Sequence, residues 1–118
     1  MSERVKLLEE AIRIVRERGD DYGKPGDHFS ITIGMLNAAF ARKLREPLTA
    51  ADWPIIMVCD KIAREQHKPK RDNACDMAGY AACLGEIRAE EKRRALEGWA
   101  RAEMERAEIE RRKVDAKA

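Results

Sequence analysis

Residues 52–80 decide the fold, and they read DWPIIMVCDKIAREQHKPKRDNACDMAGY. We expect a helix that starts near Thr49, where Thr49-Ala-Ala-Asp52 has the spacing of a capping box, or at Asp52. The run from Ile55 to Cys59 makes this helix apolar nearly all round. A link rich in Lys and Pro ends this helix, and a further helix begins at Asp72. The stretch therefore predicts two consecutive helices, of which the first is central to the core.

Two cations and a row of polar groups make the same stretch a candidate ligand site. Lys61 and Arg64 lie three residues apart, and Asp72, Asp76 and Tyr80 lie four apart, so that each set projects from one helical face. An ammonium and a guanidinium are suited to phosphate, and paired carboxylates are suited to Mg²⁺. The pattern predicts a site for a nucleotide or another phosphate-bearing ligand, with Mg²⁺ as the candidate cofactor.

The expected roles divide this site into two groups of residues. We expect Asp72 and Asp76 as metal ligands and catalytic groups, and Asp21, Tyr22, Lys61, Arg64, Asn73 and Tyr80 as ligand-binding groups. The cations would hold phosphate, the two aspartates would hold Mg²⁺ or a ribose, and a tyrosine would stack on the base.

Ordinary structural roles compete with each of these assignments. Asp72 is well placed as a helix N-cap, and Arg64 can pair with Asp60 one turn earlier. Lys61 can be a solvated residue near a helix C-terminus, and Tyr22 can cover the end of the first helix. The residue pattern alone leaves both sets of roles open.

The composition restricts the class of protein. The chain has 118 residues, of which 44% are hydrophobic, 5% aromatic and 39% charged, and its net charge is +2. This balance favours one helical domain and gives no general argument for nucleic-acid or membrane binding. No apolar run approaches transmembrane length and no targeting signal is visible, so we expect a cytoplasmic protein.

The remaining helices follow from apolar spacing and breaker residues. We expect a first helix over residues 2–18 with Ser2 as its N-cap, a turn over residues 19–27, and a second helix over residues 28–45 capped by Asp27. The sequence predicts an all-α fold, with a four-helix bundle-like core over residues 1–89 and a long charged C-terminal helix over residues 90–118. In that extension, favourable pairs are Glu90–Arg94, Glu97–Arg101 and Glu108–Arg112.

Cysteine and histidine give no sign of a zinc site. Cys59, Cys75 and Cys83 form no C-x-x-C pair, which argues against a disulfide framework, and we expect them as small core residues. His28 and His67 have no partner at ligand spacing.

The order of motifs resembles a known kind of family. Arg18-x-x-Asp21-Tyr22-Gly23-x-Pro25-x-x-x-Phe29, then Lys61-x-x-Arg64, then Asp72-Asn73-x-x-Asp76-x-x-Gly79-Tyr80-Ala81, is similar to small phage and prophage proteins of unknown function. The same skeleton resembles phage nucleotide-modification-associated domains and, more distantly, the all-α NTP pyrophosphatase (MazG-like) superfamily. The distant resemblance implies a four-helix fold, often oligomeric, with an acidic Mg²⁺ site for a nucleotide. This chain lacks a clear E-x-x-E on the early helix, and only Asp76 falls on the aspartate of the family's E-x-x-D.

Three functions follow from these observations. The first is a phage-type nucleotide-binding protein, which as an enzyme would be a Mg²⁺-dependent NTP pyrophosphohydrolase. The second is a non-catalytic protein that sequesters a nucleotide signal of a bacterial defence system. The third is a structural protein that assembles through its C-terminal helix. We expect a homo-oligomer whose partner is a nucleotide or nucleotide-derived small molecule.

Overall fold

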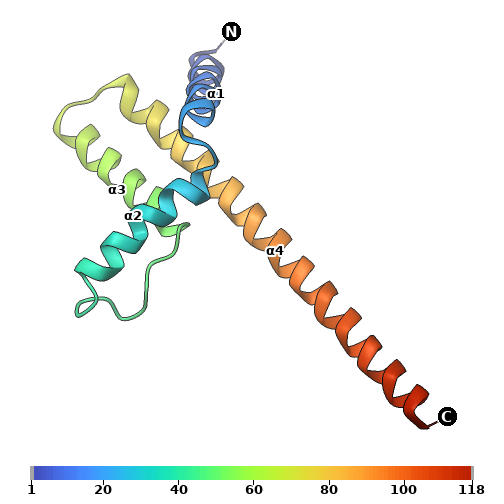
Figure 1. Ribbon diagram of the computed structural model, residues 1–118. Helices are drawn as coiled ribbons and strands as arrows, with labels where there is room; N and C mark the ends of the chain where they lie inside the picture. Colours follow the sequence, from blue (N-terminus) through green and yellow to red (C-terminus); the bar gives the residue numbers. More distant parts are fainter. Residues whose placement is uncertain (1, 118) are drawn as a thin grey trace. The chain divides into compact units, whose positions relative to one another are not determined.

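The computed structural model describes residues 2–117, and these form four helices and no strand (Figure 1). In chain order the helices are α1 (Glu3–Tyr22), α2 (Pro25–Ala39), α3 (Asp52–His67) and α4 (Arg71–Lys117). The predicted all-α class is confirmed, including the long C-terminal helix. Within the described residues, no helix is long and apolar enough to cross a lipid bilayer.

The chain divides into two compact units, one that ends at Ile87 and one that begins at Arg88. We call residues 2–87 the core unit and residues 88–117 the tail unit. The predicted division into a core domain over residues 1–89 and a charged extension over residues 90–118 stays a prediction.

Helix α1 begins as expected but ends later. The Ser2 hydroxyl accepts a hydrogen bond from the backbone N–H of Val5 at 3.3 Å, so Ser2 is the N-cap. The expected end at Arg18 is wrong, because the helix continues through Gly19 to Tyr22. Gly23 ends it with φ 74°, a left-handed conformation that glycine adopts without a steric penalty, and its N–H bonds to the carbonyl of Gly19 at 3.1 Å.

Helix α2 is displaced toward the N-terminus of the chain relative to the prediction. It starts at Pro25, with Lys24 as the N-cap, so Asp27 lies in the first turn and is not the cap. Proline suits this position because its missing N–H would have no partner there. The helix ends at Ala39 and not at Arg45.

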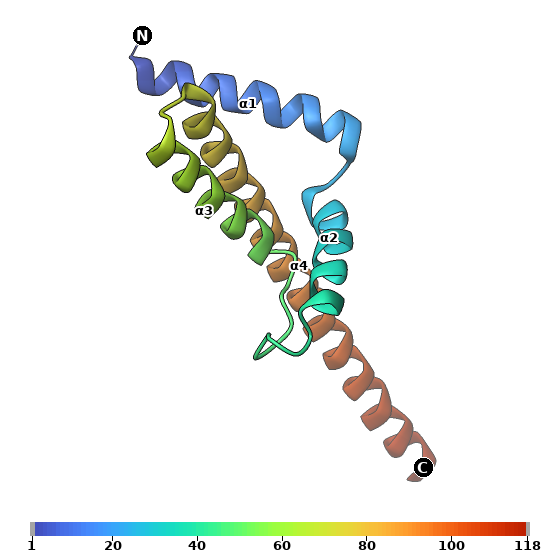
Figure 2. The ribbon, with the colours of Figure 1, turned by 90° about the vertical axis from the view of Figure 1, so that its left-hand side faces the viewer.

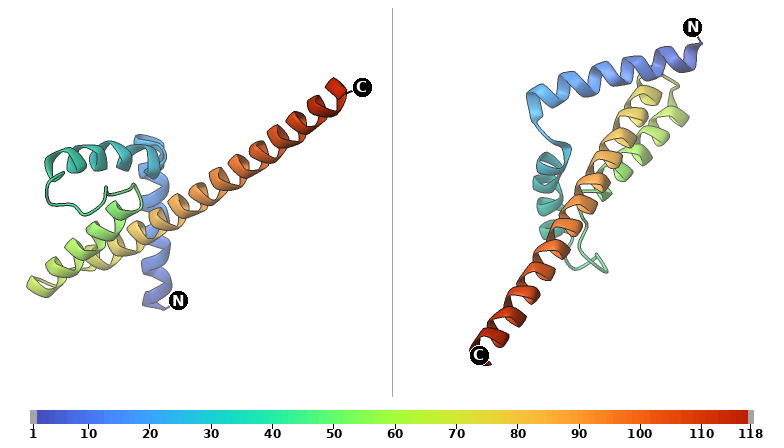
Figure 3. Two further views of the ribbon diagram at one scale, coloured as in Figure 1. Left: turned by 90° about the horizontal axis from the view of Figure 1, so that it is seen from below. Right: turned by 90° about the vertical axis from the view of Figure 1, so that its right-hand side faces the viewer.

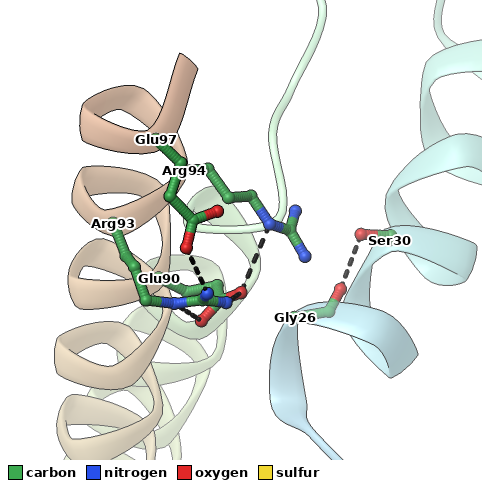
Figure 4. Close-up of polar contacts among 6 residues, drawn as sticks. All are labelled: Gly26, Ser30, Glu90, Arg93, Arg94 and Glu97. Carbon is green, nitrogen blue, oxygen red and sulfur yellow. Dashed lines mark hydrogen bonds and ion pairs between the residues drawn. The ribbon is translucent and has the colours of Figure 1, made fainter. Parts of the chain in front are cut away.

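Side chains on α2 stabilise its first turn and the loop that follows it. The Ser30 hydroxyl donates to the carbonyl of Gly26 at 2.6 Å (Figure 4). Asn37 holds the loop by two hydrogen bonds to the backbone of Leu48, at 2.8 and 3.0 Å. This bidentate contact brings the chain back from α2 toward the start of α3.

Helix α3 and the first part of α4 run antiparallel and side by side in the core unit (Figures 2 and 3). The expected interaction between Thr49 and Asp52 is present, since a carboxylate oxygen of Asp52 accepts from the N–H of Thr49 at 2.7 Å. At the other end, Arg71 at the start of α4 pairs with Glu10 on α1 at 3.0 Å. Farther along α4, Gly79 lies against Val15 of α1, where an added Cβ would meet a methyl group at 3.8 Å.

The apolar core of the core unit is small. Phe29, Ala51 and Ile87 form a buried cluster, against which pack the partly buried residues Ala50, Trp53, Tyr80, Cys83 and Leu84. The prediction that α3 is the central helix is wrong, because Ile55, Ile56 and Ile62 on it stay 44%, 38% and 44% exposed. Only Pro54 on α3 is buried, so this helix packs through one side.

The tail unit is a helix covered by short-range ion pairs. Figure 4 shows Arg93 and Arg94 around the carboxylate of Glu90, with Arg94 at 3.3 Å. The predicted Glu90–Arg94 pair is therefore confirmed, and so is Glu108–Arg112 at 3.2 Å. The predicted pair of Glu97 with Arg101 is wrong, because Glu97 pairs with Arg93 at 2.8 Å.

Candidate functional site

The main hollow of the core unit has a volume of about 1050 Å³, and all four helices contribute to its wall. We call it the aromatic hollow. It is lined by Ala11, Ile14, Val15, Glu17, Arg18, Gly19, Asp21, Gly23, Lys24, Pro25, His28, Phe29, Thr32, Trp53, Cys75, Asp76, Gly79, Tyr80, Cys83 and Glu86. Its volume lies just above the upper end of the range for pockets that bind small molecules or cofactors, roughly 300–1,000 Å³.

Three aromatic side chains give this hollow its apolar surface. Phe29 is buried, and its ring centroid lies 6.5 Å from that of Tyr80, with the planes tilted by 38°. Trp53, at the start of α3, is half-buried against the same cluster. Because each ring is fixed by packing on a helix, this surface is preformed for a flat apolar group.

Charged side chains of both signs surround the aromatic surface. The cationic or titratable groups on the wall are Arg18, Lys24 and His28. The acidic groups are Glu17, Asp21, Asp76 and Glu86. Arg18 and Asp21 are three residues apart on α1, so the extension of this helix to Tyr22 places both on one face.

An ion pair joins α3 to α4 beside this hollow. The ammonium nitrogen of Lys61 lies 3.0 Å from a carboxylate oxygen of Asp76. The Lys61 side chain is 14% exposed and that of Asp76 is 26% exposed, so water screens the pair only in part. Lys61 and Asp76, which were expected to bind different parts of a ligand, thus balance each other's charge.

A second, smaller hollow of about 420 Å³ lies at the turn between α3 and α4. We call it the basic hollow, and it is lined by Ala63, Arg64, His67, Lys68, Lys70 and Asn73. One donor of the Arg64 guanidinium is already engaged, because its Nε donates a hydrogen bond to the Asp60 carboxylate at 2.9 Å. The predicted structural alternative for Arg64 is therefore confirmed.

Glu65 stabilises the turn that forms the basic hollow. One of its carboxylate oxygens accepts from the backbone N–H of Lys70 at 2.9 Å and from the side-chain amide of Asn73 at 3.1 Å. These hydrogen bonds, the one from Lys70 first, lower the pKa of Glu65 below its ordinary value. Asn73 is buried and polar, and its amide is satisfied by this contact.

The structure separates the predicted site residues into two places. Asp21, Asp76 and Tyr80 line the aromatic hollow, whereas Arg64 and Asn73 line the basic hollow. Lys61 pairs with Asp76, and Asp72 is an exposed residue in the first turn of α4 that lines neither hollow. The side chain of Tyr22 lies outside what the structure describes.

The Mg²⁺ prediction rested on Asp72 and Asp76. Among the described residues, no group of three or more His, Cys, Asp or Glu side chains is arranged to hold a metal ion. Asp76 has the Lys61 ammonium as its charge partner. The metal-binding and catalytic roles of the two aspartates stay predictions.

Sequence reasoning missed several residues of the aromatic hollow. Glu17 and Lys24 were not among the predicted site residues, and Lys24 was expected in a turn because α1 was predicted to end at Arg18. The signal that could have located them is the sequence Gly23-Lys24-Pro25, in which a glycine follows one helix and a proline starts the next. With the helix extended, Glu17 and Asp21 fall one turn apart.

Two cysteine thiols lie in the wall of the aromatic hollow. Burial raises the pKa of Cys75, and the negative charge of Glu10 adds to the effect. Burial also raises the pKa of Cys83, with Glu86 contributing. Both thiols are therefore neutral and weakly nucleophilic at neutral pH, in agreement with a packing role. The prediction of a core residue is wrong for Cys59, which is exposed.

Comparison with known proteins identifies the kind of chain this is. A family model described as "Domain of unknown function (DUF6378)" matches residues 6–88. The Gene 55 protein of Mycobacterium phage D29 is 38% identical over 83 residues, which cover 69% of this chain and 52% of that protein. The chain thus spans about half the length of this curated relative. No solved structure matches the chain.

These matches confirm the predicted resemblance at its coarser level, that of a family of unknown function with a phage relative. The matched segment contains both hollows and every motif on which the resemblance rested. The closer likeness to nucleotide-modification-associated domains and to the MazG-like superfamily stays a prediction.

Proposed function

The chain belongs to the DUF6378 family of unknown function, and we propose that it binds a nucleotide or a nucleotide-derived molecule in the aromatic hollow. One observation carries the proposal. Residues of motifs far apart in the sequence, Arg18 and Asp21 on α1 and Asp76 and Tyr80 on α4, line a single hollow of about 1050 Å³. That volume accommodates a nucleotide, which has a flat apolar part and a charged part.

The aromatic surface is suited to the base. Phe29, Trp53 and Tyr80 come from three different helices and pack in one cluster. A purine or pyrimidine ring placed against them would gain about 1–3 kcal/mol per stacked base, as in other proteins that stack bases on aromatic side chains. Stacking of this kind is tolerant of base identity, so base selection must come from polar groups on the wall.

The charged groups are suited to the sugar and phosphates. Arg18 and Lys24 are exposed and line the hollow from α1 and from the turn after it, where they would contact phosphate oxygens. Asp21 lies one turn beyond Arg18 and can accept hydrogen bonds from ribose hydroxyls. In this arrangement Lys61 stays paired with Asp76 and does not bind phosphate. Phosphate would be bound by Arg18 on α1 and by Lys24 in the turn after it.

The test compares two arginines of one helix. Binding of a panel of NTPs, dNTPs and cyclic dinucleotides is measured by calorimetry for wild type, Arg18→Ala and Arg16→Ala. Arg16 is exposed on α1 and does not line the hollow, so it is the matched control. We expect Arg18→Ala to weaken binding by about 10-fold or more and Arg16→Ala to leave it unchanged. Equal effects of the two substitutions, or no binding across the panel, would contradict the proposal.

Metal-assisted hydrolysis of a bound NTP is the second candidate. It is supported by the acidic groups that line the same hollow as the aromatic rings, namely Glu17, Asp21, Asp76 and Glu86. As an NTP pyrophosphohydrolase, the protein would release a monophosphate and pyrophosphate only with Mg²⁺. In that case Asp76→Asn should abolish turnover, and turnover that persists in this variant would exclude the catalytic role of Asp76.

Sequestration without chemistry gives the opposite result in the same experiment. Nucleotide that is recovered intact from the protein, with equal affinity in Mg²⁺ and in EDTA, would support a protein that withdraws a nucleotide signal. The Lys61–Asp76 ion pair favours this alternative, because it supplies charge balance at Asp76 without a metal.

A further inference from the structure

The outward side of α3 is an uncharged helical face on a highly charged protein. Positions 55, 56, 59, 62, 63 and 66 share this face, and they hold Ile, Ile, Cys, Ile, Ala and Gln. All six side chains are exposed, including Ile55 at 44% and Ile62 at 44%. Within residues 2–87, Figures 2 and 3 show α4 beside α3 and no other helix on the side that faces away from α4.

The charged residues in the middle of α3 all lie off this face and have partners within the chain. Asp60 pairs with Arg64 at 2.9 Å, Lys61 pairs with Asp76 at 3.0 Å, and Glu65 accepts hydrogen bonds from the turn before α4. A solvent-facing helix normally carries its charges outward. Here the outward face carries none between the first turn and the last, although 39% of the chain is charged.

We propose that this face is the interface of a homodimer, in which α3 packs antiparallel on α3 of a second copy around a twofold axis near Cys59. A twofold interface is self-complementary: if one residue contacts a second residue of the other copy, that second residue contacts the first in turn, and only a residue on the axis faces its own counterpart. A charged residue on the axis would meet a like charge, so an uncharged centre of the face is favourable for this symmetry.

The order of residues along α3 fits a twofold axis at Cys59. The face positions are symmetric about it: Ile56 corresponds to Ile62, and Ile55 corresponds to Ala63. Antiparallel packing would therefore place isoleucine against isoleucine and the largest side chain against the smallest, which is favourable for interdigitation.

Charge at the two ends of α3 supports the same partner. The first turn carries Asp52 and the last turn carries Arg64 and His67. Antiparallel packing brings the acidic end of one α3 to the basic end of the other, and it also aligns their dipoles favourably. A second copy therefore satisfies both the apolar and the charged features of this helix. The interface lies on the opposite side of α3 from α4 and is separate from the aromatic hollow.

The test measures oligomeric state with two substitutions of the full chain. Light scattering after size exclusion is run over a concentration series for wild type, Ile62→Glu and Met104→Glu. Met104 is an exposed apolar residue of the tail unit and serves as the control. We expect a dimer for wild type and Met104→Glu, and for Ile62→Glu a dissociation constant raised on the order of 100-fold or more, with an unchanged circular dichroism spectrum.

Cross-linking gives a second readout that needs no destabilising substitution. Helix axes about 8–10 Å apart, with Cα atoms about 2.3 Å from each axis, leave facing Cα atoms about 3.4–5.4 Å apart, and the upper part of this range suits a disulfide. Mild oxidation with copper phenanthroline should link wild-type chains through Cys59, and Cys59→Ser should abolish the link. If Ile62→Glu fails to fold, the comparison of cross-linking in wild type and in Cys59→Ser decides by itself whether the proposed dimer forms.

Three outcomes would overturn the proposal. A monomeric wild type would mean that the face is free or takes a different partner. A dimer that survives Ile62→Glu but is lost in Met104→Glu would assign assembly to the tail unit. A dimer that oxidises without any Cys59 link would place the twofold axis elsewhere.

Discussion

The ammonium of Lys61 on α3 and the carboxylate of Asp76 on α4 lie 3.0 Å apart, and both side chains are largely removed from water. This pair connects the two antiparallel helices beside the aromatic hollow. It gives both motifs a structural role, since a lysine expected to hold phosphate and an aspartate expected to hold Mg²⁺ form an ion pair with each other.

Breaking this pair from one side should destabilise the core unit. Lys61→Met leaves Asp76 partly buried without its counter-charge, and Asp76→Asn leaves Lys61 in the same state, so we expect each to cost about 1–3 kcal/mol. The double variant Lys61→Met/Asp76→Asn should lose less than the sum of the two. Urea unfolding of all four proteins measures the coupling, and strictly additive losses would show that the pair contributes nothing.

Glu65 should make stability depend on pH on the acidic side. Its pKa is lowered in the folded protein by hydrogen bonds from Lys70 and Asn73, so the unfolded chain takes up the proton first as pH falls. The stabilisation is complete above the ordinary carboxyl pKa and is lost as pH falls through the lowered value. Glu65→Gln should remove this component, so that its stability falls less steeply with acid than that of wild type.

Thermal unfolding between about pH 7 and pH 3 measures the Glu65 effect. Glu9→Gln is the control, because Glu9 is an exposed carboxylate on α1. If Glu9→Gln and Glu65→Gln flatten the pH profile equally, then the turn contacts of Glu65 are not responsible.

The two thiols of the aromatic hollow should limit stability at alkaline pH. Burial raises the pKa of Cys75 and Cys83 above the ordinary value of 9.0, so the unfolded chain loses these protons first as pH rises. Their contribution is present below pH 9 and is lost above it.

Labelling of both thiols by a disulfide reagent should be slow in the folded protein and should accelerate in urea. Fast labelling of Cys75 at neutral pH would contradict its burial.

Deleting residues 90–118 should leave the core unit folded and able to bind its ligand. Both hollows and α3 lie within residues 2–87, and Ile87, the last member of the buried cluster, is retained. We expect unchanged ligand affinity and an unchanged dimer. The exposed apolar side chains of the tail unit, which are Leu96, Trp99, Met104, Ile109 and Val114, are the basis of the alternative. Loss of the oligomer with retained binding would make the tail unit an assembly element.

The existence and type of the helices could be predicted from the sequence by itself, because they depend on local interactions. Apolar spacing, the Ser2 cap and the Thr49–Asp52 contact all involve residues within one or two turns. The errors were also local: the end of α1 was predicted at Arg18 because a turn was expected from Gly19 onward, whereas Gly23 is the residue that ends α1.

Only the tertiary structure decided which side chains share a site. Helical spacing places Lys61 and Arg64 on neighbouring positions of α3, yet Lys61 pairs with Asp76 while Arg64 lines the basic hollow. The period of a helix is set by its own backbone hydrogen bonds, but the contact between two helices depends on their packing geometry, which no single segment encodes. The same reason explains α3, whose apolar residues predicted a buried helix while packing covers only the side that faces α4.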